Sequence, residues 1–175
     1  MSGETIILLM FGVLVGVAAT VTMDVLGSIA RRVGLAAGAK GQWVGRWYLG
    51  IARGKLVHAD IAAAPELAGE KQAALVGHYV IGIVLAVFYV VGAGLLDVSP
   101  GGFLVAIGYG LATCVFPWFL VFPALGFGVF GLKGPPELRL FTSSVMNHLF
   151  YGLGLWWTAK VLQLGQGAAK LPFSP

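Results

Sequence analysis

Four long apolar stretches constrain this chain more than any other feature of its sequence. They cover residues 5–30, 75–96, 102–122 and 140–162. As an α-helix, each is long enough to cross the hydrocarbon core of a bilayer, which is about 30 Å thick. Only 10% of the 175 residues are charged, against about 25% in soluble proteins. We therefore predict an all-α integral membrane protein, a single domain over residues 1–175 with four transmembrane helices in a compact bundle.

The basic residues are sorted by their position along the chain. Nine of the eleven follow either the first or the third stretch: Arg31, Arg32, Lys40, Arg46, Arg53, Lys55, Lys71, Lys133 and Arg139. The positive-inside rule assigns these connections to the cytoplasm and leaves both termini outside. A net charge of +4 arranged in this way is unlike the basic surface of a nucleic-acid-binding protein. The expected partners are the lipid bilayer and other membrane subunits or a second copy, with no nucleic acid.

The connection of residues 32–74 is too long to be a featureless loop. On a helical wheel Trp43 and Trp47 share one face, whereas Arg46 and Arg53 project from the other. This pattern is typical of a helix in the headgroup layer, and it also fits a helix packed on the cytoplasmic ends of the bundle. We predict a cytoplasmic-side interfacial amphipathic helix between the first and second spans.

Two prolines mark the end of the third stretch. Pro117 and Pro123 each lack a backbone N–H, and proline tends to kink a membrane helix. We expect the membrane helix to end near Pro123 and to be followed by a glycine-rich interfacial segment.

Three ionisable side chains lie inside the predicted spans. With the N-terminus outside, Asp24, His78 and His148 reach a similar depth in the cytoplasmic leaflet on three different helices. An ionised carboxylate that faces lipid costs several kcal/mol. We therefore expect Asp24 to point inward, where one of the two imidazoles would be its partner.

Other polar residues extend this predicted buried polar site. Thr20 lies one turn before Asp24, in a row of small residues that would let another helix approach closely. Asn147, His148 and Tyr151 share one face of the last helix.

The residue types leave several uses open for the site. His78, His148 and Asp24 form a plausible ligand set for a metal ion, with His58 as a further imidazole. Two histidines on separate helices could equally hold a haem iron. The same residues could instead fix the helix register by hydrogen bonding, or form a path for protons or cations.

Four short motifs, in their order and spacing, resemble a family of small bacterial membrane proteins catalogued as domain-of-unknown-function family 2938. The motifs are Thr20-Val-Thr-Met-Asp24, Gly45-Arg46-Trp47, His78-Tyr79 with Gly82, and Asn147-His148 with Gly152. The resemblance extends over roughly Gly12 to Leu162 and implies a four-helix inner-membrane protein. It brings no established activity.

The sequence favours a non-enzymatic role over an enzymatic one. We predict a multi-pass membrane protein with a buried Asp/His polar site near the cytoplasmic leaflet, either binding a metal or cofactor or serving as an accessory subunit of a membrane assembly. The alternatives are a membrane redox enzyme with a His-ligated metal or haem, and a small proton or cation transporter.

Overall fold

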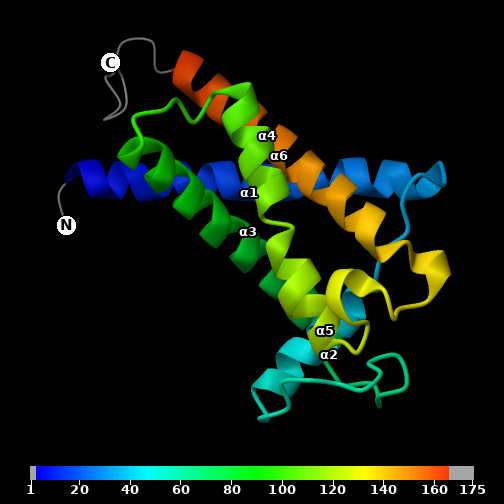
Figure 1. Cartoon of the computed structure of the whole chain (residues 1–175). Helices are drawn as coiled ribbons and strands as arrows, with labels where there is room; N and C mark the ends of the chain where they lie inside the picture. Colours follow the sequence, from blue (N-terminus) through cyan, green and yellow to red (C-terminus); the bar gives the residue numbers. More distant parts are fainter. Residues whose placement is uncertain (1–2, 166–175) are drawn as a thin grey trace. The chain divides into compact units, whose positions relative to one another are not determined.

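The computed structural model describes residues 3–165, and this part of the chain is helical, with no strand. The predicted locations of the two termini concern residues 1–2 and 166–175, which lie outside the described range. The α-helices, labelled in Figure 1 where there is room, are α1 (Gly3–Arg32), α2 (Gly41–Ile51), α3 (Glu70–Leu95), α4 (Phe103–Ala112), α5 (Phe122–Ala124) and α6 (Leu140–Gly165). The predicted all-α fold class is confirmed.

Three helical segments are long and apolar enough to cross a membrane: Thr5–Arg32, Glu70–Leu95 and Phe103–Ala124. They coincide closely with the first three predicted spans. The fourth predicted span, residues 140–162, is occupied by α6, which is not among the three within the described residues. Polar side chains in the first half of α6, such as Asn147 and His148, lower its mean hydropathy.

The third segment is interrupted where the prolines predict it. α4 ends at Ala112, and a π-helix follows at Pro117–Val121. The N–H of Phe122 donates to the carbonyl of Pro117, five residues earlier. Such wide turns commonly form where the regular helical ladder loses a donor. α5 ends the segment at Ala124, next to Pro123, which confirms the expected end.

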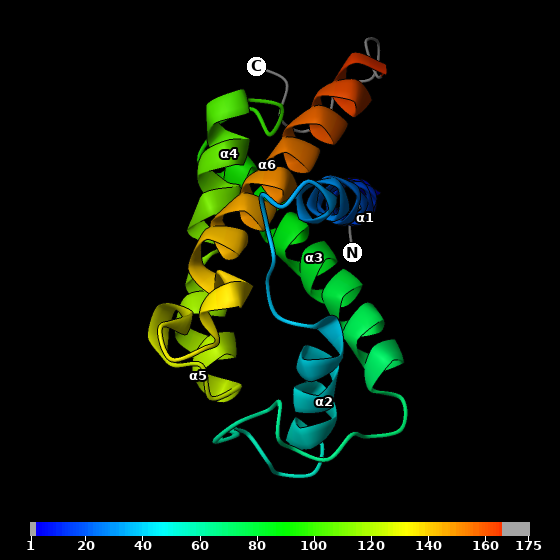
Figure 2. The same ribbon diagram turned by 90° about the vertical axis from the view of Figure 1, so that its right-hand side faces the viewer.

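The chain divides into two compact units. Unit 1 holds the described residues up to Leu26, together with Tyr79–Ala112 and the described residues from Asn147 onward. Unit 2 holds Gly27–His78 and Thr113–Met146. In Figure 2, unit 2 includes α2, drawn in cyan, and the long loop that leads from it to the beginning of α3.

Glycine residues let the helices of unit 1 approach one another closely. A Cβ placed at Gly16 would lie 2.6 Å from the Cα of Ile83, so α1 and α3 meet nearly backbone to backbone. A Cβ at Gly154 would lie 2.6 Å from the Cα of Ala19, where α6 crosses α1 (Figure 1). Close approach of this kind is how helices associate in a lipid environment. The core beside these contacts is Phe11, Val15, Ala19, Ala86, Tyr89, Val90, Ala106, Tyr151, Leu155 and Ala159.

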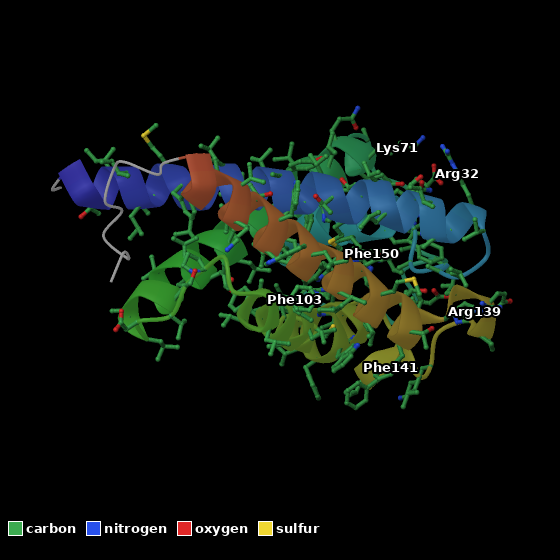
Figure 3. All side chains as sticks on the ribbon, turned by 90° about the horizontal axis from the view of Figure 1, so that it is seen from above. Arg32, Lys71, Phe103, Arg139, Phe141 and Phe150 are labelled. Carbon is green, nitrogen blue, oxygen red and sulfur yellow. The ribbon has the colours of Figure 1, made fainter. Side chains whose placement is uncertain are left out.

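The core of unit 2 is richer in large aromatic side chains. Its buried members are Trp43, Trp47, Ile61, Phe122, Ala124, Leu125, Phe127 and Leu140. Two hydrogen bonds connect the loop that follows α2 to the end of the third apolar segment. The N–H of His58 donates to Ala124 O, and the N–H of Ile61 donates to Leu125 O. Figure 3 draws the side chains as sticks and labels Arg32, Arg139 and Phe141 of unit 2.

Candidate functional site

Asp24 lies on α1 in unit 1 and has a hydroxyl partner on α3. The phenol of Tyr79 donates a hydrogen bond to Asp24 Oδ2 at 3.2 Å, and Asp24 is half-buried. The carboxylate therefore faces a neighbouring helix, on the side where Gly16 also meets α3. The predicted imidazole partner stays a prediction, and the sequence analysis did not identify Tyr79 as a partner, although it directly follows His78.

Thr20 and Tyr151 meet at Gly82, a glycine of α3. Thr20 donates its hydroxyl to Gly16 O in its own helix at 2.8 Å, and this hydroxyl is the atom that a Cβ at Gly82 would strike. From α6, the phenol of Tyr151 donates to Gly82 O at 2.6 Å. Both side chains are buried. Three helices of unit 1 are thus joined at one residue that has no side chain.

The other predicted members of the polar site have different settings. Asn147 and His148 are half-buried in unit 1, and within the described residues Asn147 Oδ1 is buried with no hydrogen-bond partner. The backbone carbonyl of His148 would lie 2.7 Å from a Cβ at Gly110, so α4 packs closely on this turn of α6. His78 belongs to unit 2. Its grouping with Asp24 and His148 stays a prediction.

The predicted metal centre gains no support from the geometry. Among the described residues there is no group of three or more His, Cys, Asp or Glu side chains that could hold a metal ion. His58, the further imidazole of the predicted set, lies in unit 2 beside Gly50, where its Nε2 would be 3.3 Å from a Cβ. Burial, and secondarily the charges of Lys55 and Arg46, lower the pKa of His58 below its ordinary value.

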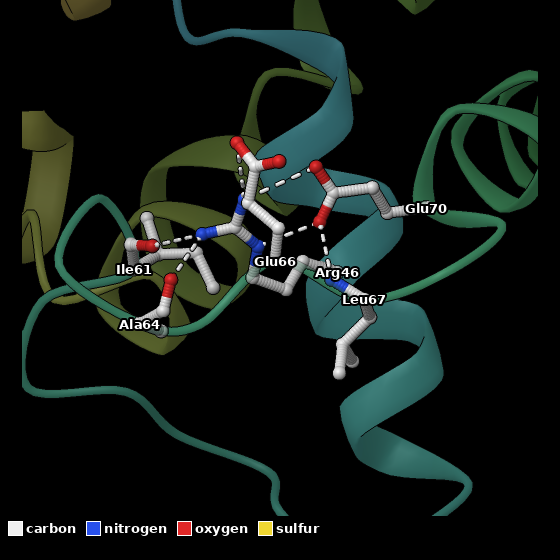
Figure 4. Close-up of polar contacts among 6 residues, drawn as sticks. All are labelled: Arg46, Ile61, Ala64, Glu66, Leu67 and Glu70. Atoms are coloured by element: carbon white, nitrogen blue, oxygen red, sulfur yellow. Dashed lines mark hydrogen bonds and ion pairs between the residues drawn. The ribbon is translucent and has the colours of Figure 1, made fainter.

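The most completely satisfied polar cluster surrounds Arg46 of α2 (Figure 4). Its guanidinium binds Glu70 through two bonds, Nε to Oε2 at 2.7 Å and Nη2 to Oε1 at 3.1 Å. Its Nη1 donates to the carbonyl oxygens of Ile61 and Ala64. Glu66 adds a longer ion pair at 3.8 Å. Paired guanidinium–carboxylate geometry of this kind is among the stronger polar contacts in proteins.

This cluster corrects the prediction that Arg46 projects from the polar face of an interfacial helix. Arg46 is only 2% exposed, and its hydrogen bond to Glu70 raises its pKa above the ordinary value, so the side chain stays charged. The helical wheel could not reveal a carboxylate 24 residues away. Gly45 makes the pairing feasible, because any Cβ there would collide with the backbone of Glu70.

Of the two settings left open for the tryptophan face of α2, the structure shows packing on protein, and its place at a membrane interface stays a prediction. Trp43 and Trp47 are buried in the core of unit 2, and Trp47 Nε1 donates to Leu56 O at 2.8 Å. Arg53 is exposed, as an interfacial position requires. The apolar face of α2 thus packs on protein. Glu70 was the residue that sequence reasoning missed, and the available signal was that a buried cation needs a carboxylate partner.

The fold and the site define an all-helical protein with three segments apolar enough to cross a membrane and a polar helix crossing centred on Gly82. A family model described as "Protein of unknown function (DUF2938)" matches residues 13–162, and the chain belongs to that family. The family resemblance read from the sequence is confirmed. No curated protein and no solved structure matches the chain.

Proposed function

We propose that the chain is a four-span protein of the bacterial inner membrane that serves as a non-enzymatic subunit of a membrane assembly. The observation that supports this role best is the bond between Tyr79 and Asp24 on the crossing of α1 and α3. Asp24 lies in line with Gly16 and Thr20, which contact the same helix. The intramembrane carboxylate thereby sets how two helices fit together, which is a structural use of a polar residue in a bilayer.

Exposed apolar side chains support the membrane environment. Along the unit 1 part of α1 they recur every three or four residues and form a continuous stripe: Ile6, Met10, Val13, Val17, Val21 and Val25. A stripe of this length on a soluble protein would be a contiguous apolar patch that water disfavours. In hydrocarbon it is the expected surface.

α6 is the fourth span of this proposal. From Leu140 to Ala159 it carries no Asp, Glu, Lys or Arg. Its Ser143 and Ser144 are buried, and Asn147 and His148 are half-buried, so lipid would meet few of its polar groups. A helix shielded in this way can cross a bilayer with a lower mean hydropathy than one that faces lipid all round.

Topology can be tested with single cysteines in a Cys114→Ser background. We expect Arg53→Cys, in the long connection, to react with an impermeant maleimide only from the cytoplasmic side. Ser99→Cys, between α3 and α4, should react only from the opposite side. Labelling of both positions from one side would contradict the four-span arrangement.

The assembly role is tested on the intact chain purified in a mild detergent. Native mass spectrometry should show one stoichiometric complex that contains this chain and other membrane subunits, without stoichiometric metal or haem. A chain that runs alone contradicts the subunit role. A stoichiometric metal or a Soret absorption band would instead favour the redox alternative.

One observation favours proton or cation transport as a second candidate. Asp24 is half-buried, not sealed, and its partner Tyr79 is a hydroxyl that can both donate and accept a proton. Proteoliposomes should then show a pH-dependent flux that Asp24→Asn abolishes. Absence of flux at every pH would end this candidate.

A further inference from the structure

Two parts of unit 2 that are distant in the sequence present arginines at one edge. Arg31 and Arg32 end α1, and Arg139 immediately precedes α6. Figure 3 labels Arg32 and Arg139, together with Phe141. Exposed apolar side chains accompany them. We call the following set the arginine edge: Arg31, Arg32, Val33, Leu35, Arg139 and Phe141.

Hydrogen bonds hold the two parts of the arginine edge together. Arg139 Nη1 donates to Gly34 O at 3.2 Å, which places this guanidinium beside the residues that follow Arg32. Ala37 N–H donates to Ser143 Oγ at 3.0 Å, and Gly38 N–H to Leu138 O at 2.6 Å. The Arg139 guanidinium and the backbone that follows Arg32 are therefore positioned by the fold, so a ligand would bear less of the cost of ordering this edge.

The charge of the edge is strongly unbalanced. All three arginines are exposed, and Glu137 is the one acidic residue in the sequence of the two segments, 27–39 and 129–141. A guanidinium presents a planar set of N–H donors that matches a phosphate group. The edge is thus suited to an anion with phosphate geometry.

The apolar side chains of the edge distinguish a lipid from a soluble anion. Val33, Leu35 and Phe141 are 63%, 62% and 44% exposed, which water alone disfavours. The first apolar segment ends at Arg32, so in a membrane these residues lie where headgroups meet acyl chains. Arginines near apolar side chains at this depth are typical of sites for anionic headgroups.

We propose that the arginine edge binds the phosphate group of an anionic phospholipid, with Val33, Leu35 and Phe141 against its acyl chains. This inference rests on the proposed membrane location. It goes beyond that location by assigning one lipid class to one set of residues.

The test measures lipid binding by the intact chain in detergent, from the rise in its unfolding temperature on titration with phosphatidylglycerol or phosphatidylcholine. Phosphatidylglycerol should stabilise the wild-type chain at lower concentration. Arg32→Gln, which removes no hydrogen bond seen in the structure, should weaken its apparent affinity about fivefold, as expected for one basic residue at the surface. Arg139→Gln should weaken it at least as much. Arg53→Gln is the matched control and should leave it unchanged.

Equal phosphatidylglycerol affinity in wild type, Arg32→Gln and Arg139→Gln would overturn the proposal. So would an equal loss in Arg53→Gln, which would indicate a diffuse charge effect, or full displacement of the lipid by millimolar inorganic phosphate, which would indicate a soluble anion. Extraction of the chain from native membranes by alkaline carbonate would contradict the membrane function itself, and the detergent titration would still report whether the edge selects this lipid.

Discussion

Each of the two units is stabilised internally by a different kind of contact. In unit 1, glycine contacts bring helices together, and tyrosine hydroxyls donate to backbone carbonyls, as Tyr89 does to Pro100 O and Tyr109 to Leu85 O. In unit 2, a buried ion pair and a core of large aromatic side chains perform this task. Polar side chains in unit 1 thus make single hydrogen bonds, whereas in unit 2 they organise a whole loop.

This difference has a physical origin in the backbone. The helices of unit 1 satisfy their own N–H and C=O groups, so side-chain hydroxyls have little to add beyond a few crossings. Unit 2 contains a long irregular connection whose carbonyls need donors, and Arg46 supplies two of them, at Ile61 and Ala64. Breaking one contact in each unit should therefore lower the stability of the protein by very different amounts.

The largest effect is expected from Arg46→Met. This change leaves the Glu70 carboxylate buried without its cation and removes the donors to two loop carbonyls, at a cost of about 3–5 kcal/mol. Thermal unfolding in detergent should show a large decrease in stability, and limited proteolysis should cut the 52–69 connection first.

Arg53→Met is the control for Arg46→Met, because it removes an exposed arginine close by in the sequence and should change stability little. The double variant Arg46→Met with Glu70→Leu should recover part of the loss, since no buried charge then remains unpaired. If Arg46→Met alone were as stable as wild type, unit 2 would not depend on this ion pair.

A bulky residue at a glycine crossing should produce the next largest effect. Gly154→Leu would force side-chain atoms into Ala19 of α1, where even a Cβ has no room, at a cost of about 3 kcal/mol. Thermal unfolding and the yield of monodisperse protein report the loss. Gly92→Ala is the control, because a Cβ at Gly92 meets nothing within 4 Å, and it should be neutral or slightly stabilising. Equal destabilisation by both changes would contradict the role of close approach in unit 1.

The sequence predicted unit 1 better than unit 2, for reasons visible in single residues. Helix length and the row of Gly16, Thr20 and Asp24 are local patterns, and they pointed correctly to a face that meets another helix. The partner of Arg46 depended on a pairing across an irregular loop, which periodicity does not encode. A wheel drawn for α2 alone therefore placed a buried cation on an exposed face.

The hydroxyl partner of Asp24 shows a subtler limit. Charge arguments favour an imidazole for a carboxylate in hydrocarbon, but they do not say which side of α3 faces α1. His78 and Tyr79 are adjacent and therefore point about 100° apart on the helix. The pairing of His78 stays a prediction, and whether Tyr79 reaches Asp24 depends on helix rotation. Packing at Gly82 sets that rotation, and only coordinates show it.

A smaller loss is expected from Tyr79→Phe. It removes the hydroxyl that donates to Asp24, and an interhelical hydrogen bond of this kind contributes about 0.5–1.5 kcal/mol. Thermal unfolding of the purified chain should show a modest decrease. Asp24→Asn keeps an acceptor for Tyr79 and should be less destabilising than Asp24→Ala. A Tyr79→Phe variant that lost as much stability as Gly154→Leu would show that the polar contact, more than the glycine packing, holds unit 1 together.

The smallest expected effect is a dependence of stability on pH, and it arises in unit 2. The ring nitrogens of His58 in unit 2 are buried with no hydrogen-bond partner among the described residues, and the side chain is 5% exposed. Burial, followed by Lys55 and Arg46, lowers its pKa in the folded state, whereas in the unfolded state it titrates near its ordinary value of about 6.5. As the pH falls below that value, the unfolded chain takes up a proton that the folded chain resists. Stability is then full well above pH 6.5 and, between pH 6.5 and pH 5.5, declines by at most about 1 kcal/mol.

Hydrogen exchange of the 52–69 connection between pH 7.5 and 5.5 would measure this decline, after correction for the intrinsic pH dependence of exchange. In His58→Phe the aromatic ring is kept and the titration is removed, so the protection of the connection should no longer depend on pH in this range. If His58→Phe kept the wild-type dependence of protection on pH, another group would have to take up the proton. Because His58 N–H also donates to Ala124 O through the backbone, which the substitution leaves in place, a loss of slope without a loss of protection at pH 7.5 would assign the effect to the imidazole alone.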